Sequence, residues 1–376
     1  MNKKDLIDLI RAHLDNNETM FWNTCKHIAD GFYQRADERF ADYLISLFTN
    51  NYLIAQDEDT NKIEDIDKII SNNEVLSSFL MKINYSNFDP LYFNDEIKED
   101  FFGIYNAIKN KRKVNKFLFI GESGTGKTAS SLYLAKLLNK KVYSVVFENL
   151  IDSKLGESLK NLSNLFKELN SLPDNLKDNL IIFFDEIDTL VLNRISNQDL
   201  REMGRLTSLF LKELDNLSSN LILIATTNLS KELDKALLRR FDAIINFDRY
   251  SKDDLIDIAI LLLKEESKNI DYIEINENLF KKIINIDLNS KNLLTPGKLK
   301  NIIRSAIAFS SQNNSKDYLR KIYNSIKIID ELNFKTKEEE ITFLKKHDFT
   351  LRETEILTLV SKSSVSRIIG GQNIEF

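Results

Sequence analysis

The eight-residue stretch GESGTGKT has the residue types and spacing of a phosphate-binding loop. It stands between the apolar run KFLFI and a stretch with helical periodicity, the context that this pattern requires. Its glycines let the backbone turn its N–H groups toward phosphates, Lys127 reaches the β- and γ-phosphates, and the Thr128 hydroxyl binds Mg²⁺. The alternative is a flexible strand–helix turn. The predicted nucleotide-binding residues are Gly121, Glu122, Ser123, Gly124, Thr125, Gly126, Lys127 and Thr128.

Two further apolar runs end in polar side chains suited to nucleotide chemistry. In IIFFDE, Asp185 is expected to join the nucleotide site as a ligand of the Mg²⁺ shell, and Glu186 to polarise the attacking water. A buried strand explains the apolar residues but not two adjacent charges, although a solvated strand end is the alternative. LILIATTN ends in Asn228, whose amide could orient that water or touch the γ-phosphate; asparagine is also a common turn former.

The segment LDKALLRRFD places Arg239 and Arg240 side by side where a helix runs into a strand. One arginine at a helix end could neutralise the helix dipole, but two in succession point in different directions around the axis. The pair therefore predicts an anionic partner. The alternative is a surface pair bound to nearby acids such as Asp242.

Composition narrows the class of protein. A chain of 376 residues with 43% hydrophobic and 29% charged residues is long enough for two or three domains. The net charge of -5 argues against a surface that coats nucleic acid or anionic membrane as a whole, so any DNA contact is confined. The single cysteine excludes an intrachain disulfide, and the apolar runs are too short to span a bilayer. The charged start is unlike a signal peptide, and a cytoplasmic location is expected.

The order of periodicities predicts an α/β fold. Between residues 88 and 248, five β-rich runs alternate with helical stretches, which indicates a parallel sheet sandwiched by helices. The runs are KFLFI, KVYSVVF, NLIIFFDE, NLILIATTN and AIINF. Helical periodicity dominates on both sides of this core, and an acidic stretch precedes it. The expected divisions are a helical N-terminal domain at 1–55, a linker at 56–87, the α/β core at 88–248, a helical lid at 249–330 and a helical C-terminal segment at 331–376.

Together, GESGTGKT, IIFFDEID, ATTN and LDKALLRRFD resemble the AAA family of ATPases within the AAA+ class, over roughly residues 88–310. DSKLGES and the stretch after IIFFDEID look especially like bacterial members related to the Cdc48 and katanin branches. The resemblance implies a P-loop module with an α-helical lid that hydrolyses ATP with Mg²⁺. It also implies a homo-oligomer, expected as a hexameric ring, in which Arg239 and Arg240 project toward the ATP of a neighbouring subunit.

Two positions depart from the family pattern. Members that thread polypeptide usually carry an aromatic–hydrophobic–glycine pore loop, and the aligned triplet here is Lys154, Leu155 and Gly156. A lysine there mildly favours a nucleic-acid or polar substrate over an apolar polypeptide. TPGKLKNII occupies the lid position where many AAA+ proteins have a sensor arginine, and Lys298 is the candidate stand-in.

The C-terminal stretch FTLRETEILTLVSKSSVSRII, residues 349–369, is predicted as helix, turn, helix and resembles segments of DNA-binding regulators. Leu359 occupies a turn position where glycine is common. The alternative is a hairpin that completes the lid or docks on a neighbouring subunit.

Three functions are compatible with these residues. The first is a ring-forming AAA ATPase that remodels a macromolecule, with a protein as substrate or a partner such as a protease. The second is a DNA-associated ATPase that assembles on DNA through residues 349–369. The third is an ATP-dependent binding switch with little turnover, against which Glu186 argues.

Overall fold

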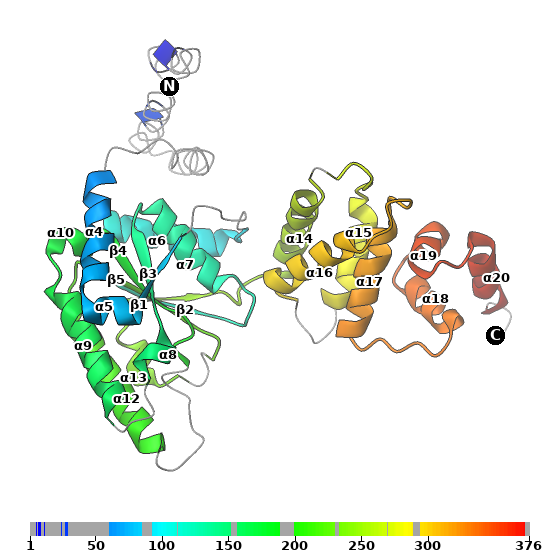
Figure 1. Cartoon of the computed structure of the whole chain (residues 1–376). Coiled ribbons are helices and arrows are strands. Elements are labelled where there is room, and N and C mark those ends of the chain that lie inside the picture. Colours follow the sequence, from blue (N-terminus) through cyan, green and yellow to red (C-terminus); the bar gives the residue numbers. More distant parts are fainter. Residues whose placement is uncertain are drawn as a thin grey trace.

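The computed structural model describes residues 60–84, 92–110, 112–151, 156–188, 199–229, 233–268, 270–288 and 294–372, with a few isolated residues between 5 and 28. Nearly all of the predicted N-terminal helical domain therefore lies outside the described residues. The described chain forms an α/β body that holds every strand, followed by a wholly helical part that ends with α20 (Figure 1). Across these residues, no helix is long and apolar enough to cross a bilayer.

A six-stranded sheet in the order β1-β3-β4-β5-β2-β6 forms the centre of the α/β body. The five strands from β2 to β6 are parallel and coincide with the five runs predicted from the sequence, whereas β1 is antiparallel to β3. The predicted fold class is therefore confirmed. The strands are β1 (Leu80–Ile83), β2 (Lys116–Ile120), β3 (Lys141–Val145), β4 (Leu180–Phe184), β5 (Ile222–Thr227) and β6 (Ala243–Asn246).

Both faces of the sheet are buried under helices. Along β4, Ile182 and Phe184 point into one apolar cluster, and Ile181 and Phe183 point into another on the opposite face. This alternation follows from the two-residue period of a strand, and burial on both faces explains its unbroken apolar run. The helices of the body are α4 (Thr60–Asn72), α5 (Glu74–Phe79), α6 (Asp95–Lys109), α7 (Lys127–Leu137), α8 (Phe147–Leu150), α9 (Glu157–Ser171), α10 (Asp174–Lys177), α12 (Asp199–Asp215) and α13 (Lys235–Leu238).

The segment predicted as a linker at 56–87 instead carries α4, α5 and β1. Its acidic stretch suggested a solvated segment, but several of its apolar residues point inward, although Ile69 and Met81 are exposed. Ile66, Ile70, Leu76 and Phe79 are all buried in the cluster that also contains α9 and α12. The segment is therefore part of the α/β body, and it supplies the antiparallel edge strand that the sequence did not predict.

Asp67 attaches α4 to the edge of the sheet. Its carboxylate accepts hydrogen bonds from the Tyr143 hydroxyl at 2.5 Å and the Lys82 ammonium at 2.7 Å, and the Lys141 ammonium lies 2.6 Å away. Burial tends to raise the pKa of Asp67, but these donors outweigh it and lower the pKa to about 2. The charged form of this carboxylate is thus the one that stabilises the fold.

The described residues of the helical part form four helices, α14 to α17, which we call the lid, and three C-terminal helices. The bounds are α14 (Lys252–Glu266), α15 (Glu277–Leu288), α16 (Pro296–Ala308), α17 (Asp317–Ile329), α18 (Lys337–Lys346), α19 (Leu351–Thr358) and α20 (Lys362–Gln372). Leu344, Phe349 and Leu357 belong to the same buried cluster as the lid helices. The Lys282 ammonium, on α15, lies 2.8 Å from the Glu353 carboxylate, on α19. The C-terminal segment therefore docks on the lid.

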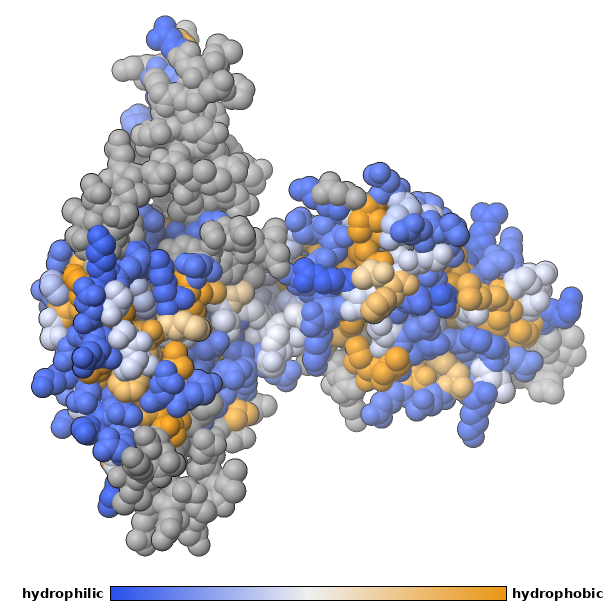
Figure 2. Space-filling model, in the orientation of Figure 1, coloured by the Kyte–Doolittle hydropathy of each residue, from blue (hydrophilic) through white to orange (hydrophobic). Residues whose placement is uncertain are grey.

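The predicted helix, turn and helix near the C-terminus are confirmed as α19 and α20. Leu359 caps α19 in the left-handed conformation, with φ 59°. Glycine adopts this conformation without strain, which explains why it is common in such turns. Figure 2 shows a mostly hydrophilic surface with separate small apolar patches over both parts of the molecule.

Candidate functional site

Three predicted motifs meet at one edge of the sheet. The phosphate-binding loop follows β2, Asp185 and Glu186 follow β4, and Asn228 follows β5; these strands are neighbours in the order β4-β5-β2. The carboxyl ends of parallel strands lie at the same edge, which is where open α/β sheets bind ligands. Residues of these three motifs line a cavity of about 460 Å³. The structure thus brings together residues that are about a hundred positions apart.

The phosphate-binding loop has the backbone conformation that its glycines allow. Gly124 and Gly126 have φ values of 82° and 98°, and α7 begins directly after them. The N-terminal N–H groups of this helix favour an anion. The Lys127 side chain, only 6% exposed, donates hydrogen bonds of 2.7 Å to the carbonyls of Gly121 and Glu122. The loop and its lysine are arranged around a space suited to phosphate groups.

The environment of Lys127 acts on its charge in two opposing ways. Burial lowers the pKa of the ammonium below its ordinary value of 10.5, and the nearby carboxylates favour the charged form. Those carboxylates belong to Asp248, Asp185, Asp188 and Glu186. A buried cation flanked by acids is a functional-site signature, since such groups are costly to bury without a ligand to bind.

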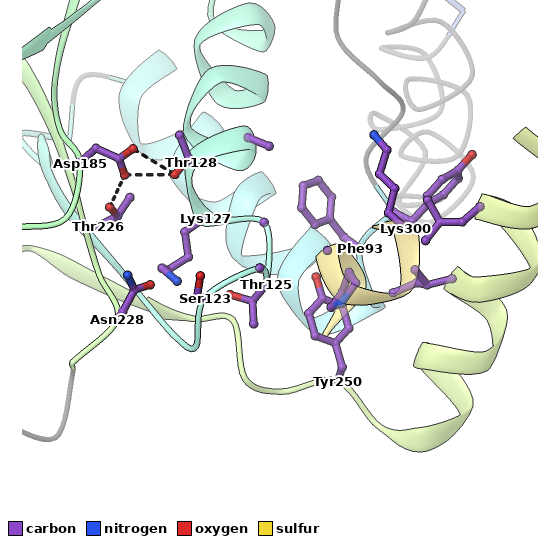
Figure 3. A pocket seen from close by; sticks show the side chains of 18 of the residues that line it. Phe93, Ser123, Thr125, Lys127, Thr128, Asp185, Thr226, Asn228, Tyr250 and Lys300 are labelled. Carbon is purple, nitrogen blue, oxygen red and sulfur yellow. Dashed lines mark hydrogen bonds between the residues drawn. The ribbon is translucent and has the colours of Figure 1, made fainter. Parts of the chain in front are cut away.

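Thr128 and Asp185 form the part of the site that suits a metal ion. The Thr128 hydroxyl lies 3.0 and 3.2 Å from the two carboxylate oxygens of Asp185 (Figure 3). Among the described residues there is no group of three or more histidine, cysteine or acidic side chains that could hold a metal. One hydroxyl and one carboxylate fit Mg²⁺, which takes few protein ligands and relies on phosphates and water for the rest.

Glu186 and Asn228 lie against each other. The Asn228 side-chain amide donates to a Glu186 carboxylate oxygen at 3.1 Å. Glu186 has φ 53°, an uncommon conformation for a non-glycine residue that often occurs at functional sites. Asp188 accepts hydrogen bonds from the Thr227 hydroxyl and, at 3.1 Å, from the Asn228 backbone N–H. The contact with Asp188 positions Asn228 beside the Glu186 carboxylate, which the sequence analysis assigned to water activation.

The opposite end of the cavity is aromatic and apolar, and the sequence motifs did not predict it. Tyr92, Phe93 and Tyr250 lie there with Ile258 and Leu262 of the lid helix α14. Figure 3 shows Phe93 and Tyr250 on the far side of the loop from Asp185 and Asn228. No spacing rule links these residues, because they come from two separate segments that only the fold brings together.

The lid touches the phosphate-binding loop directly. The Gly297 backbone N–H donates to the Gly124 carbonyl at 2.7 Å, and a Cβ at Gly297 would lie 2.8 Å from that oxygen. Pro296, Gly297 and Lys300 line the cavity, whereas Lys298 is exposed and does not. Lys300 therefore lies nearer the nucleotide site than Lys298, the stand-in predicted from the sequence.

Arg239 and Arg240 lie outside this cavity of their own chain. Arg240 donates to the Ala236 carbonyl at 3.0 Å and lies 3.4 Å from the Asp215 carboxylate. Arg239 is exposed, and its side chain makes no hydrogen bond or ion pair within the described part of the chain. Asp242, the acid suggested as a partner for the arginines, instead accepts from the backbone N–H groups of Asn115 and Lys116, both at 2.9 Å.

The predicted pore loop is described only at its end. Lys154 and Leu155 lie outside the described residues. Gly156 caps the N-terminus of α9 with φ 86°, a conformation that favours glycine. The role of these three residues stays a prediction.

Residues 117–249 match the family described as "ATPase family associated with various cellular activities (AAA)". The chain is a member of the AAA ATPase family. Among its relatives, an uncharacterised AAA family ATPase of Sinorhizobium fredii is 36% identical over 135 residues, 36% of this chain and 39% of the relative. The ATP-dependent zinc metalloprotease FtsH of Karelsulcia muelleri is 30% identical over 278 residues, 68% of this chain and 41% of the relative.

The match to these AAA relatives is partial, since the chain spans less than half of the length of either protein. A solved structure of similar fold is the Escherichia coli MS115-1 HORMA:CdnC:Trip13 complex, in which the similar chain has a TM-score of 0.53 and 18% identity. The similarity covers 66% of this chain and 95% of that one. At this identity the likeness concerns the fold alone.

Proposed function

We propose that this AAA protein is a Mg²⁺-dependent ATPase that assembles with copies of itself and uses ATP hydrolysis to remodel a protein substrate or partner. The observation that carries the proposal is the pairing of Glu186 with Asn228, at 3.1 Å, beside a phosphate-binding loop and a Thr128–Asp185 pair. A site that only bound nucleotide would not need a carboxylate held at this position. The geometry supports turnover.

Each polar group of the cavity has a distinct task in hydrolysis. The loop N–H groups and Lys127 hold the phosphates, and Thr128 and Asp185 hold the Mg²⁺. When bound, Mg²⁺ neutralises charge that develops on the phosphate oxygens. Glu186 polarises the attacking water, and Asn228 orients the Glu186 carboxylate and the water relative to each other.

The aromatic end of the cavity suits the base of ATP. Tyr92, Phe93 and Tyr250 supply ring faces, and Ile258 supplies aliphatic surface from the lid. Aromatic and aliphatic groups bind a planar base by stacking and exclusion of water. Because the lid contributes to this wall and also touches Gly124, lid movement changes both ends of the nucleotide site.

Assembly into a ring, expected to be hexameric from the AAA resemblance, is supported by the exposed arginine. Arg239 lies away from the cavity of its own chain and makes no contact that would occupy it among the described residues. An arginine supplied by another subunit stabilises charge on the transferring phosphoryl group. In this proposal, Arg239 of one subunit completes the ATP site of the neighbouring subunit, and Arg240 supports it.

A protein is the favoured substrate class because of the relatives of this chain. FtsH of Karelsulcia muelleri is named an ATP-dependent zinc metalloprotease, and it matches 68% of this chain. The part of FtsH outside the match is more than half of its length. A protease is proposed as a partner of this chain.

The test is the rate of ATP hydrolysis with and without an unfolded polypeptide, and with and without DNA. Polypeptide should raise the rate, and Glu186→Gln should lower it by about 10²–10⁴ while ATP binding is kept. Glu148→Gln is a matched control, since Glu148 is exposed on α8 away from the cavity. A wild-type protein without ATPase activity at any concentration would contradict the proposal, and so would Glu186→Gln at the wild-type rate.

A second candidate, a DNA-associated ATPase, is favoured by one observation on α20. Helix α20 packs against α18 and α19, and its Val365 is fully buried, whereas Lys362, Ser363, Ser366 and Arg367 are exposed. The helix contains no acidic residue. It lies at the end of the helical part that is farthest from the sheet (Figure 1). Docking on the lid through α18 and α19 leaves this polar face accessible to a DNA groove.

Charge reversal tests this second candidate without removing the lid core. Lys362→Glu with Arg367→Glu should weaken DNA binding and reduce its dependence on salt, by about one unit of slope per lost phosphate contact. Lys345→Glu with Lys346→Glu, on the exposed end of α18, is the control with the same total change of charge. Equal retention of the three proteins by DNA would exclude α20 as the contact.

A further inference from the structure

Thr226 contacts both acidic residues of the site, although the sequence motifs gave it no role. The side chain is 1% exposed and lies at the carboxyl end of β5. Its hydroxyl donates to an Asp185 carboxylate oxygen at 2.6 Å (Figure 3). The same oxygen accepts a hydrogen bond from the backbone N–H of Glu186 at 2.9 Å. One side chain thereby links the proposed metal ligand to the backbone that carries the proposed catalytic carboxylate.

The hydrogen-bonding capacity of a hydroxyl explains why this link is specific. A threonine hydroxyl has one proton to donate and two lone pairs to accept. With its proton on Asp185, the Thr226 oxygen can only accept from Glu186, which is the observed arrangement. Thr128, in the first turn of α7, contacts Asp185 as well, so one hydroxyl from a helix and one from a strand hold the same carboxylate. Valine has the same shape as threonine but makes neither contact.

Thr226 is also held rigidly. β5 is hydrogen-bonded between β4 and β2, and Thr226 lies opposite Phe119 in the register with β2. A β-branched side chain in a strand has few accessible rotamers, so the hydroxyl stays aimed at Asp185. The Ile187 backbone N–H, which donates to the Thr226 carbonyl at 2.9 Å, fixes the turn from the other side.

We infer that Thr226 is a positioning residue for ATP hydrolysis, which orients Asp185 for the Mg²⁺ shell and fixes the backbone turn at Glu186. The inference rests on the proposed function, because it assigns a second layer of contacts to the same site. Residues that orient a metal ligand typically affect metal affinity or activity by about 10–100-fold. A residue that only filled space in the core would affect stability without changing the requirement for Mg²⁺.

The test compares Thr226→Val, which removes the hydroxyl, with Thr226→Ser, which keeps it. Rates of ATP hydrolysis are measured over a range of Mg²⁺ concentrations, and Mn²⁺ binding is measured by electron paramagnetic resonance with a non-hydrolysable ATP analogue bound. Thr226→Val should need about tenfold more Mg²⁺ for half-maximal rate, bind Mn²⁺ about tenfold more weakly and have a kcat lower by about tenfold. Thr226→Ser should resemble the wild type in all three.

Three outcomes separate this inference from the proposed function. Wild-type Mn²⁺ affinity and Mg²⁺ dependence in Thr226→Val would overturn the inference and leave the ATPase proposal intact. A Thr226→Ser variant as impaired as Thr226→Val would also overturn it, because the hydroxyl would not be the group that matters. If Thr226→Val does not fold, the smaller Thr226→Ala is compared with Thr226→Ser in the same way. An inactive wild-type protein would instead contradict the proposed function, and the inference with it.

Discussion

Replacing Arg239 by alanine should leave ATP binding nearly unchanged and lower hydrolysis by about 10³–10⁵. This loss corresponds to roughly 4–7 kcal/mol of barrier. The structure favours Arg239 over Arg240 as the first residue to test, because Arg240 is held by Ala236 and Asp215 in its own chain. That ion pair joins side chains that are 31% and 53% exposed, so it contributes only about 0–1 kcal/mol and does not prevent Arg240 from assisting.

Mixing two inactive variants tests whether the arginine acts on a neighbouring subunit. Glu186→Gln keeps Arg239 but has an impaired nucleotide site. Arg239→Ala has an intact nucleotide site but lacks the arginine that would complete the site of a neighbour. In an equal mixture that assembles at random, about a quarter of the interfaces pair an intact Glu186 with an intact Arg239, whatever the ring size. If these interfaces carry the activity, the mixture should recover up to about a quarter of the wild-type rate. Each restored site then regains the full rate enhancement that the neighbouring arginine supplies.

The assay is the ATPase rate per subunit, measured for each variant alone and for the mixture after exchange of subunits. The wild-type rate per subunit should also rise with protein concentration, because shared sites form only on assembly. A mixture as inactive as its components would show that Arg239 does not complete the site of a neighbour. A wild-type rate that stays constant down to concentrations where only monomer is detected would lead to the same conclusion.

Three other changes have expected outcomes. Lys127→Ala should abolish binding of a fluorescent ATP analogue, since its ammonium is the buried cation of the loop; unchanged affinity would refute the phosphate site. Asp67→Asn should lower the free energy of unfolding at pH 7 by about 1 kcal/mol after discounting for partial exposure. The Asp67 pKa is about 2 in the fold and 3.8 unperturbed, so the stabilisation is full above about pH 4 and the difference between variant and wild type in denaturant titrations should vanish as pH falls through 2. Leu359→Gly should stabilise the C-terminal helices by about 0.5–1 kcal/mol, because φ 59° suits glycine and the side chain is 66% exposed; Leu359→Ala, which keeps the strain, should not raise the melting temperature.

The sequence alone was sufficient where a short segment contains its own physical reason. GESGTGKT specifies a glycine-rich turn before a helix, and β4 and β5 are recognisable because apolar runs end in polar residues. These features depend on neighbours within a few positions. They predicted five strands of a parallel sheet, the phosphate-binding loop and the roles of Asp185, Glu186 and Asn228. The structure places these three residues at one edge of the sheet, because parallel strands bring their carboxyl ends together.

Composition misled the interpretation of residues 56–87. The stretch AQDEDTNKIEDIDK at its start has more acidic than large apolar residues, which is typical of a linker. Only the tertiary structure shows that Ile66 and Leu76 pack against the sheet and that Asp67 meets two lysines and a tyrosine. A mean over many residues cannot detect a few inward-facing side chains, because the partners that bury them are far away in the chain.

Contacts between distant segments were decided by the tertiary structure. Thr226 reaches Asp185 across 41 positions, and Gly297 reaches Gly124 across the boundary between lid and core. The sequence treats Arg239 and Arg240 alike, and only the position of Asp215 at the end of α12 distinguishes them. Local sequence determines backbone conformation and periodicity because those depend on adjacent residues. The choice of contact partner depends on strand order and helix packing, which the whole chain sets at once.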